Sequence, residues 1–256
     1  MVKPGRYDYL DKIKLEKPEW VLDFSFHPMA NYFQKGDKFL SENPQFLGNL
    51  INKVSSFYSV DNKSEYSHSG IITNTDGTIL EASWTVQHNN LLETYEGKKV
   101  LVARHNEMTI NKFNSGMKKI EEHIGQIYPF PRLLLHLIGL AKHVHWNRVV
   151  CSELCAKFLF GADLFSYKYF GVTPDLLNDI FKKELNDERT GPKYKIVYEN
   201  ILPVNIYKRC MTCNVNILVP HNHSNCPACN YSNSLNQESV FLPELVKYNS
   251  SKKIKG

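Results

Sequence analysis

The pattern of hydrophobic and polar positions predicts a β-hairpin in the first third of the chain. Residues 67–73 and 78–83 are rich in residues that favour strands, and residues 74–77 between them end in an Asp-Gly pair typical of tight turns. A Gly-Asp turn at residues 36–37 leads into another strand near Phe39. Because β-forming residues cluster again later in the chain, we expect further strands at residues 99–104, 195–198 and 204–207.

Helices are predicted where apolar residues recur every three or four positions, or where capping residues mark a start. The polar stretch 186–193 contains a Gly-Pro pair and is predicted to be a loop. Together with the hairpin, these helices favour the α+β class, with an antiparallel sheet packed on helices. The predicted helices lie at residues 46–58, 110–124 (ended by Gly125), 133–144, about 151–161, and from Thr173-Pro174 onward.

The composition is that of an ordinary globular protein. The chain has 256 residues, of which 42% are hydrophobic and 22% charged, and this suffices for one sizeable domain and a small appendage. The net charge of +5 is mild, whereas nucleic-acid-binding proteins usually carry a denser basic patch. The basic cluster of Lys252, Lys253 and Lys255 is expected to be a solvated tail.

The sequence predicts neither a signal peptide nor a transmembrane segment. Residues 1–20 are polar and lack the apolar core of secretion signals. The most hydrophobic stretch, residues 133–140, contains His136 and is too short to span a bilayer. We therefore expect the protein to reside in the cytoplasm. Packaging into a virion or release by cell lysis would leave no mark in the sequence.

Four of the six cysteines have the spacing of a metal site. Cys210 and Cys213 form one CxxC pair, Cys226 and Cys229 form another, and twelve residues separate the two pairs. The sequence therefore predicts a zinc ribbon that holds one ion. Four protein ligands leave no position for water, so the zinc would be structural, although His221 or His223 could replace one cysteine. A ribbon of this kind often binds a partner, either a protein or a nucleic acid.

The remaining two cysteines, Cys151 and Cys155, lie one helical turn apart. Cys151 follows Val149-Val150 and opens a segment that favours a helix. Unpaired backbone N–H groups at a helix start stabilise a thiolate, so Cys151 is a candidate nucleophile. The alternative is a buried structural cysteine, which is the role expected for Cys155 one turn further in.

His68 is the histidine best placed to serve as a base. It stands at the start of a predicted strand, and Glu81 lies on the return strand of the same hairpin. Glu81 could accept a hydrogen bond from the imidazole and fix its orientation. The alternative is a surface His–Glu pair without a catalytic role. Should His68 lie far from Cys151, His88 and His145 are the next candidates.

Six short segments, taken in order along the chain, resemble the circularly permuted branch of the papain-like NlpC superfamily, which includes YiiX-like hydrolases and lecithin–retinol acyltransferases. The resemblance covers roughly residues 30–180, and the histidine precedes the cysteine, as in the permuted branch. The segments are residues 36–39 (Gly-Asp-Lys-Phe), 66–71 (Tyr-Ser-His-Ser-Gly-Ile), 79–82 (Ile-Leu-Glu-Ala), 125–128 (Gly-Gln-Ile-Tyr), 150–154 (Val-Cys-Ser-Glu-Leu) and 173–176 (Thr-Pro-Asp-Leu).

The resemblance implies a permuted papain-like domain at residues 1–200, followed by the zinc ribbon and basic tail at residues 201–256. It further implies a thiolate at Cys151, a base at His68 and an orienting carboxylate at Glu81. Tyr66, or the backbone N–H of Cys151, would help to hold the oxyanion. The ribbon is not part of the common pattern of the family.

The expected function is therefore that of a cysteine hydrolase, of peptidase or amidase type. It would cleave an amide bond in a peptide, a peptidoglycan fragment or an isopeptide-like linkage through a thioester. A lipid esterase or N-acyl transferase of the same fold is the alternative, and an apolar groove near residues 133–140 would favour it. A third alternative is a catalytically inert binding module that carries a zinc ribbon.

Overall fold

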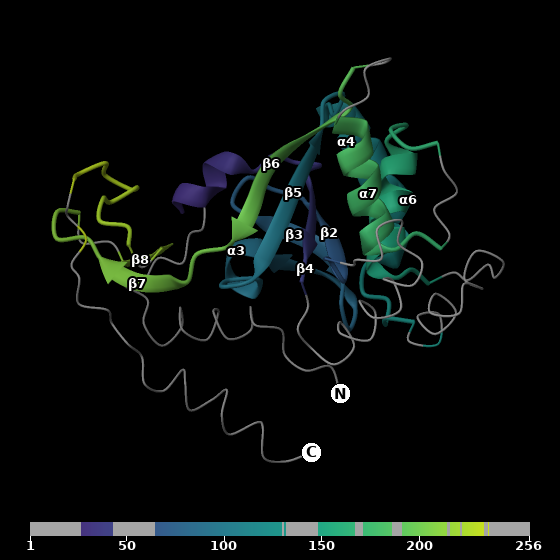
Figure 1. The fold of residues 1–256 in the computed structure, drawn as a ribbon. Coiled ribbons are helices and arrows are strands. Elements are labelled where there is room, and N and C mark those ends of the chain that lie inside the picture. The colour runs from purple at the N-terminus through teal and green to yellow at the C-terminus, as the bar shows by residue number, and fades with distance from the viewer. Residues whose placement is uncertain are drawn as a thin grey trace, which may run out of the picture. The chain divides into compact units, whose positions relative to one another are not determined.

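The computed structural model divides the described residues into two compact units. Met29–Leu202 belong to the larger unit (Figure 1), and His27, Pro28 and the described residues from Pro203 onward belong to the smaller one. The structure describes residues 27–42, 65–129, 131, 148–166, 171–185, 191–213, 216–220, 222–232 and 235.

The larger unit is built on an antiparallel sheet, which the described residues form with six strands in the order β4-β3-β2-β1-β5-β6. The hairpin predicted at residues 67–83 is confirmed as β2 and β3, and the other predicted strands of this unit are confirmed as β1, β5 and β6. The strands are β1 (Lys38–Ser41), β2 (His68–Ile72), β3 (Thr78–Ala82), β4 (Val86–Asn90), β5 (Lys99–His105) and β6 (Tyr194–Ile201).

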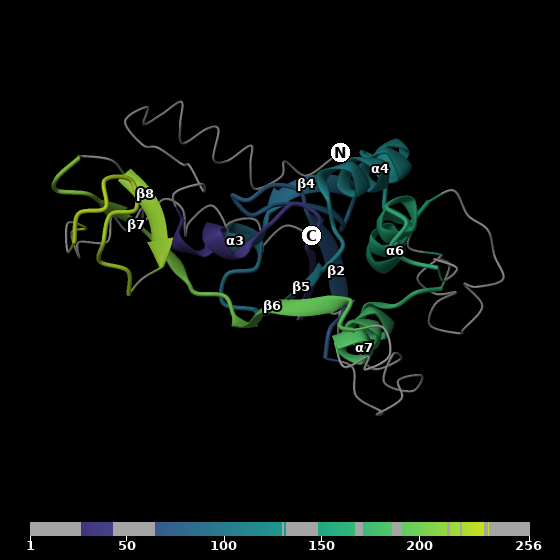
Figure 2. The ribbon, with the colours of Figure 1, turned by 90° about the horizontal axis from the view of Figure 1, so that it is seen from above.

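Three helices, α4 (Ile110–Ile120), α6 (Cys151–Gly161) and α7 (Pro174–Leu185), lie together on one side of this sheet (Figures 1 and 2). Helix α6 is the central one, because its first nine residues are all buried. It approaches α4 closely at Gly116, where an added Cβ would come within 2.7 Å of the Phe158 ring. The mixture of helices and an antiparallel sheet confirms the α+β class.

The helix boundaries follow the predicted capping residues. Helix α4 passes into the short 3-10 helix η3 (Glu121–His123), and Gly125 follows with a φ of +82°. Helix α7 begins at Pro174, and the Thr173 hydroxyl accepts a hydrogen bond from the Leu176 N–H at 3.1 Å. No helix in the part of the chain that the structure describes is long and apolar enough to cross a bilayer.

The sequence did not predict β4 or the one-turn helix α3 (Leu91–Thr94) that follows it. Strand β4 contains Gln87-His88-Asn89-Asn90 and shows no alternation of apolar residues, yet it pairs with β3 along its whole length. The 3-10 helix η2 (Pro28–Tyr32) was also not predicted. The helices predicted at 46–58 and 133–144 lie outside the described residues, as does most of the loop at 186–193.

The smaller unit contains a two-stranded antiparallel sheet of β7 (Asn205–Arg209) and β8 (Asn216–Pro220). The strand predicted at residues 204–207 corresponds to β7, whereas β8 was not predicted. His27 belongs to this unit, and its Nε2 lies 2.8 Å from Oδ1 of Asn205. Cys210 and Cys213 lie in the connection between β7 and β8, next to the Arg209–Asn216 pair.

Candidate active site

Cys151 is the first residue of α6, where the helix leaves its backbone N–H groups without helical partners. Val150 before it has an extended backbone, with φ −86° and ψ 168°, so the helix begins at the cysteine. The thiol is buried and hydrogen-bonded to the His68 ring, to the backbone N–H of Ser69 and to the Tyr128 hydroxyl. The structure thus brings the predicted nucleophile and the predicted base together.

Electrostatics favour an ion pair between Cys151 and His68. Burial raises the pKa of the Cys151 thiol, but the His68 charge and the hydrogen bonds from His68 and Ser69 bring this pKa below its ordinary value. Burial lowers the pKa of His68, but the Cys151 thiolate and Glu81 together raise it to about 10. Each group therefore favours the charged form of the other, and a thiolate paired with an imidazolium is the reactive form of a catalytic cysteine.

Cys155 has the opposite environment. It is fully buried in the core one turn along α6, and burial raises its pKa to about 12. A thiol with so high a pKa stays protonated at neutral pH and is a poor nucleophile. The two cysteines therefore differ in reactivity although they lie on the same helix.

Glu81 is the third member of the site and receives three hydrogen bonds. His68 Nε2 lies 2.8 Å from its Oε2, the Tyr95 hydroxyl donates to the same oxygen at 2.5 Å, and Asn89 Nδ2 donates to Oε1 at 2.6 Å. Burial raises the pKa of Glu81, but these donors bring it below its ordinary value, so the carboxylate stays ionised. Because Nε2 of His68 is used by Glu81, Nδ1 is the ring nitrogen left to face the sulfur.

Aromatic rings hold the imidazole in place. Tyr95 stacks on His68 with ring centroids 6.0 Å apart and an interplanar angle of 21°. Phe39 lies 6.2 Å from the His68 ring and 5.2 Å from that of Tyr95. The Phe39 ring passes over Gly70, where an added Cβ would come within 2.3 Å of it. The packing of the ring thus requires glycine two residues after the histidine.

The tyrosine beside the sulfur is Tyr128, not Tyr66. The Tyr66 hydroxyl donates to Oε1 of Glu199 on β6 at 3.2 Å, and Lys99 Nζ lies 5.4 Å from the centroid of the Tyr66 ring. Tyr128 reaches Cys151 from the segment that pairs with Thr85 through Ile127. A catalytic role for Tyr66 stays a prediction. Tyr128 was already part of the segment 125–128, but nothing in its spacing marked it as a neighbour of the cysteine.

Of the two alternative bases, His88 lies on β4 with an exposed side chain, and His145 lies outside the described residues. Neither Asn89 nor Tyr95 was singled out by the sequence. Asn89 belongs to the polar strand β4 and Tyr95 ends α3, and only the pairing of β4 with β3 brings them to Glu81.

Replacing Tyr95 with phenylalanine should lower the free energy of unfolding by roughly 2 kcal/mol at pH 7, because the hydroxyl donates to a buried carboxylate. Tyr198→Phe is the matched control, since that exposed hydroxyl donates to the Ile201 carbonyl and should cost less than about 1 kcal/mol. Urea unfolding measures both values. The depressed pKa of Glu81 gives stability that is present above the ordinary glutamate pKa and lost as the pH falls through the lower folded value. Equal losses in the two variants at pH 7 would contradict the assignment.

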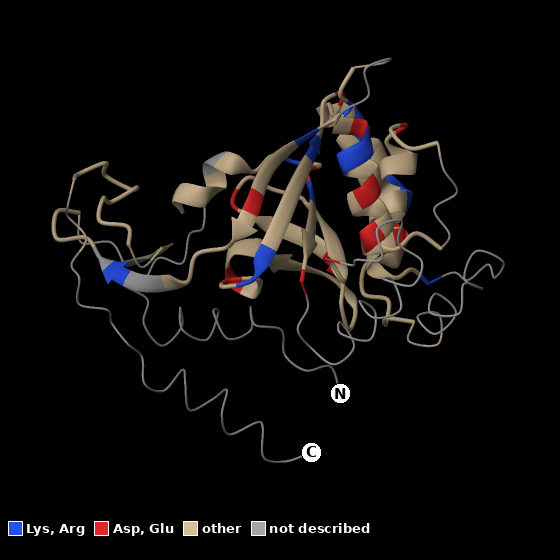
Figure 3. Cartoon of the chain, in the orientation of Figure 1, with Lys and Arg blue, Asp and Glu red and all other residues tan. Residues whose placement is uncertain are grey.

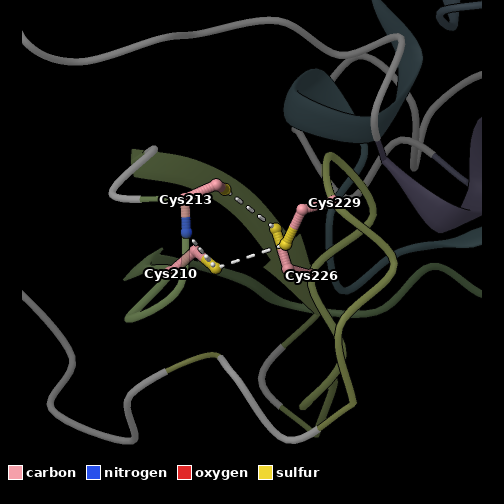
Figure 4. A group of neighbouring side chains, drawn as sticks. All are labelled: Cys210, Cys213, Cys226 and Cys229. Carbon is pink, nitrogen blue, oxygen red and sulfur yellow. Dashed lines mark hydrogen bonds between the residues drawn. The ribbon is translucent and has the colours of Figure 1, made fainter.

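A separate cluster lies in the smaller unit, where the sulfurs of Cys210, Cys213, Cys226 and Cys229 all lie within 4.8 Å of one another (Figure 4). The Cys210–Cys229 and Cys213–Cys226 sulfur pairs are each 3.7 Å apart. Metal–sulfur bonds of about 2.3 Å in a tetrahedron imply sulfur–sulfur distances of about 3.8 Å, so the cluster has the dimensions of a four-thiolate metal site. His223 is not part of this cluster, and His221 lies outside the described residues.

The first CxxC pair has the local geometry of a metal knuckle. The backbone N–H groups of Thr212 and Cys213 both donate to Sγ of Cys210 at 3.4 Å. Such hydrogen bonds favour the thiolate form, which is the form that binds a metal. The four cysteines can therefore hold a metal ion.

Comparisons with known proteins find similarity in structure only. No protein-family model matches the chain, and no curated protein matches it in sequence. Among the solved structures that match is the metalloprotein YiiX from Escherichia coli O157:H7, with 15% identity and a TM-score of 0.44 over 65% of this chain and 97% of that chain. The chemistry of the site rests on its own geometry.

Proposed function

We propose that the chain is a cysteine hydrolase that cleaves an amide bond through a thioester intermediate. The observation that carries this proposal is the buried row of hydrogen-bonded groups from Cys151 through His68 to Glu81, in which the thiol pKa is lowered and the imidazole pKa is raised. A cysteine that only fills space in the core does not need a positively charged imidazole beside its sulfur. Cys151 would be the nucleophile, His68 the acid and base, and Glu81 the orienting carboxylate.

In the first half of the reaction, the Cys151 thiolate attacks the carbonyl carbon and the carbonyl electrons move onto the oxygen. The backbone N–H groups at the start of α6 and the Tyr128 hydroxyl are the donors that would stabilise this oxyanion. When the tetrahedral intermediate collapses, the carbon–nitrogen bond breaks and His68 gives its proton to the leaving amine. The products of this half are a thioester on Cys151, a free amine and a neutral imidazole.

In the second half, neutral His68 takes a proton from water as the water attacks the thioester. Collapse of the second intermediate breaks the carbon–sulfur bond, releases the acid and restores the thiolate–imidazolium pair. Glu81 holds Nε2 of His68 throughout, so Nδ1 stays directed at the reacting atoms. The carboxylate also stabilises the positive ring that exists before acylation and again after deacylation.

Acyl transfer from a lipid ester, or N-acyl transfer, is the second candidate, and an apolar surface near the site favours it. The backbone of Trp84 pairs with that of Tyr128, since the Tyr128 N–H donates to the Trp84 carbonyl at 2.9 Å. Cross-strand neighbours lie side by side, so the indole, whose residue is 66% exposed, lies next to the tyrosine that contacts Cys151. An acyl chain could pack there. The predicted groove at 133–140 lies outside the described residues.

For the smaller unit we propose a zinc ribbon that binds one structural zinc ion through Cys210, Cys213, Cys226 and Cys229. The sulfur–sulfur distances support a small tetrahedral ion, and four thiolates suit zinc while leaving no position open for catalysis. The division into a permuted papain-like domain at residues 1–200 and a ribbon region at 201–256 belongs to the same proposal. The ribbon would serve as a contact for a partner.

The proposed function is tested by trapping the acyl-enzyme. We expect that a brief reaction with p-nitrophenyl acetate, followed by an acid quench, adds one acetyl group to Cys151 in the intact protein. The group should leave on treatment with hydroxylamine, be absent in Cys151→Ser and persist in Cys155→Ser. A long-chain ester that acylates faster than acetate would favour the lipid candidate. If neither ester acylates Cys151, the outcome favours the inert binding module, and equal acylation of Cys155 would overturn the assignment of Cys151 as the nucleophile.

A further inference from the structure

A polar cavity of about 170 Å³ lies at the opposite end of β1 from the proposed active site. Within the sheet, Ser41 pairs with His68, whereas Lys38 at the other end of the strand pairs with Ala103. The two ends are roughly 10 Å apart. The cavity is several times larger than the roughly 30 Å³ that one water molecule occupies in the liquid. The residues lining it include Gln34, Lys35, Asp37, Arg104, His105 and Lys195.

The acidic residue of this cavity, Asp37, is already neutralised. Arg104 donates to both of its carboxylate oxygens, from Nε at 2.8 Å and from Nη2 at 2.7 Å. The Gln34 backbone N–H donates a third hydrogen bond to Asp37 at 2.8 Å. Asp37 therefore offers little charge to any other cation.

Two exposed lysines at the cavity form no ion pair with a carboxylate in the part of the chain that the structure describes. Lys35 precedes the turn into β1 and Lys195 lies on β6, and neither forms an ion pair with any residue in the described ranges. Lys195 is also the direct cross-strand partner of Arg104. Like charges in directly opposite positions destabilise a sheet. Figure 3 shows Lys and Arg positions, in blue, near the ends of β5 and β6.

The other lining groups add hydrogen-bond donors. Burial and the charge of Lys38 lower the pKa of His105 to about 4, so its ring is neutral at pH 7. The Glu107 N–H donates to Nδ1 of this ring at 3.1 Å, which places the ring proton on Nε2. Lys38 itself is fully buried and donates to the Gly36 carbonyl at 2.9 Å. The cavity therefore combines uncompensated positive charge with neutral donors.

We propose that this cavity binds a phosphate group, either as inorganic phosphate or as the phosphate of a small monoester. A phosphate dianion would neutralise both lysines and accept hydrogen bonds from several donors at once, whereas a carboxylate carries only one charge. The site is separate from Cys151 and does not depend on the proposed hydrolase activity.

The test is a titration of the whole protein with inorganic phosphate at constant ionic strength, followed by NMR. We expect saturable shifts of the His105 and Gln34 signals without shifts of the His68 signals. The double substitution Lys35→Gln and Lys195→Gln should weaken binding by about tenfold or more, because it removes both uncompensated charges. The matched control is Lys118→Gln with Lys183→Gln, which removes two exposed lysines elsewhere and should change the affinity less than about twofold.

A parallel titration with glycerol phosphate distinguishes a site for inorganic phosphate from a site for a phosphate monoester. Tighter binding of the ester than of inorganic phosphate would support the site and indicate a monoester ligand, and equal binding would support a site that contacts the phosphate group alone. Non-saturable shifts, or equal weakening in both double variants, would overturn the proposal, because binding would then reflect only the overall charge. Circular dichroism of each variant confirms that the fold is retained.

Discussion

Replacing His68 with alanine should slow the alkylation of Cys151 by iodoacetamide at pH 5 by about tenfold or more. In the native site the imidazolium favours the ionised form of the sulfur. An ordinary thiol with a pKa of about 8.5 is only about 0.03% thiolate at pH 5. The lower basicity of the native thiolate reduces its intrinsic nucleophilicity, so the rate falls by less than the loss of thiolate.

The pH dependence of the Cys151 alkylation rate has a definite sign. Because the Cys151 pKa is lowered, the thiolate persists to lower pH than in an ordinary thiol, and the native alkylation rate should level off below the value of about 8.5 at which an ordinary thiol does so. In His68→Ala, where burial raises the thiol pKa and the imidazole no longer opposes it, the rate should rise about tenfold per pH unit below the thiol pKa. Mass spectrometry of alkylated peptides follows Cys151 and Cys155 separately.

His88→Ala is the control for this experiment, since His88 is an exposed histidine on β4, which β3 separates from the strand of His68. Its alkylation rate should stay within about twofold of the native rate. Cys155 should remain unmodified in the folded protein, because burial raises its pKa to about 12. If His68→Ala left the native rate at pH 5 unchanged, His68 would not be the group that ionises Cys151.

The central part of the site could be predicted because it depends on short-range features. Hairpin turn chemistry fixes the pairing of β2 with β3, and this register places Glu81 opposite Gly70, next to His68. The helix-favouring segment that begins at Cys151 fixes the start of α6. Both features lie within a few residues of the groups they position, so local preferences decide them.

The supporting residues could not be predicted, because they depend on contacts between distant segments. Strand β4 carries few apolar residues. It forms because each of its residues pairs with a residue of β3 in the antiparallel sheet. Asn89 and Tyr95 reach Glu81 only through that pairing. Likewise, Tyr66 is close to His68 in sequence but bonds to Glu199, whereas Tyr128 comes to Cys151 from sixty residues further along the chain than His68.

Removal of the metal should unfold the smaller unit. Among its described residues, the buried apolar cluster consists of Cys210, Val219, Cys226 and Leu235, so there is little core to hold the β7–β8 hairpin without an ion. Structural zinc sites contribute roughly 10 kcal/mol or more of apparent binding free energy, which becomes folding free energy when the apo form is unfolded. Freshly purified protein should contain about one equivalent of zinc.

Hydrogen exchange measures this effect directly. After chelation, the amides of β7 and β8 should exchange at nearly the rate of an unfolded chain, and Cys226→Ser should do the same without a chelator. Cys155→Ser is the control, because it removes a buried thiol outside the metal cluster. The alkylation rate of Cys151 should stay unchanged in metal-free protein, because the cluster and Cys151 belong to different compact units. Protection of β7 and β8 that survives chelation, or a zinc content below about half an equivalent, would show that the four thiols are held without a metal.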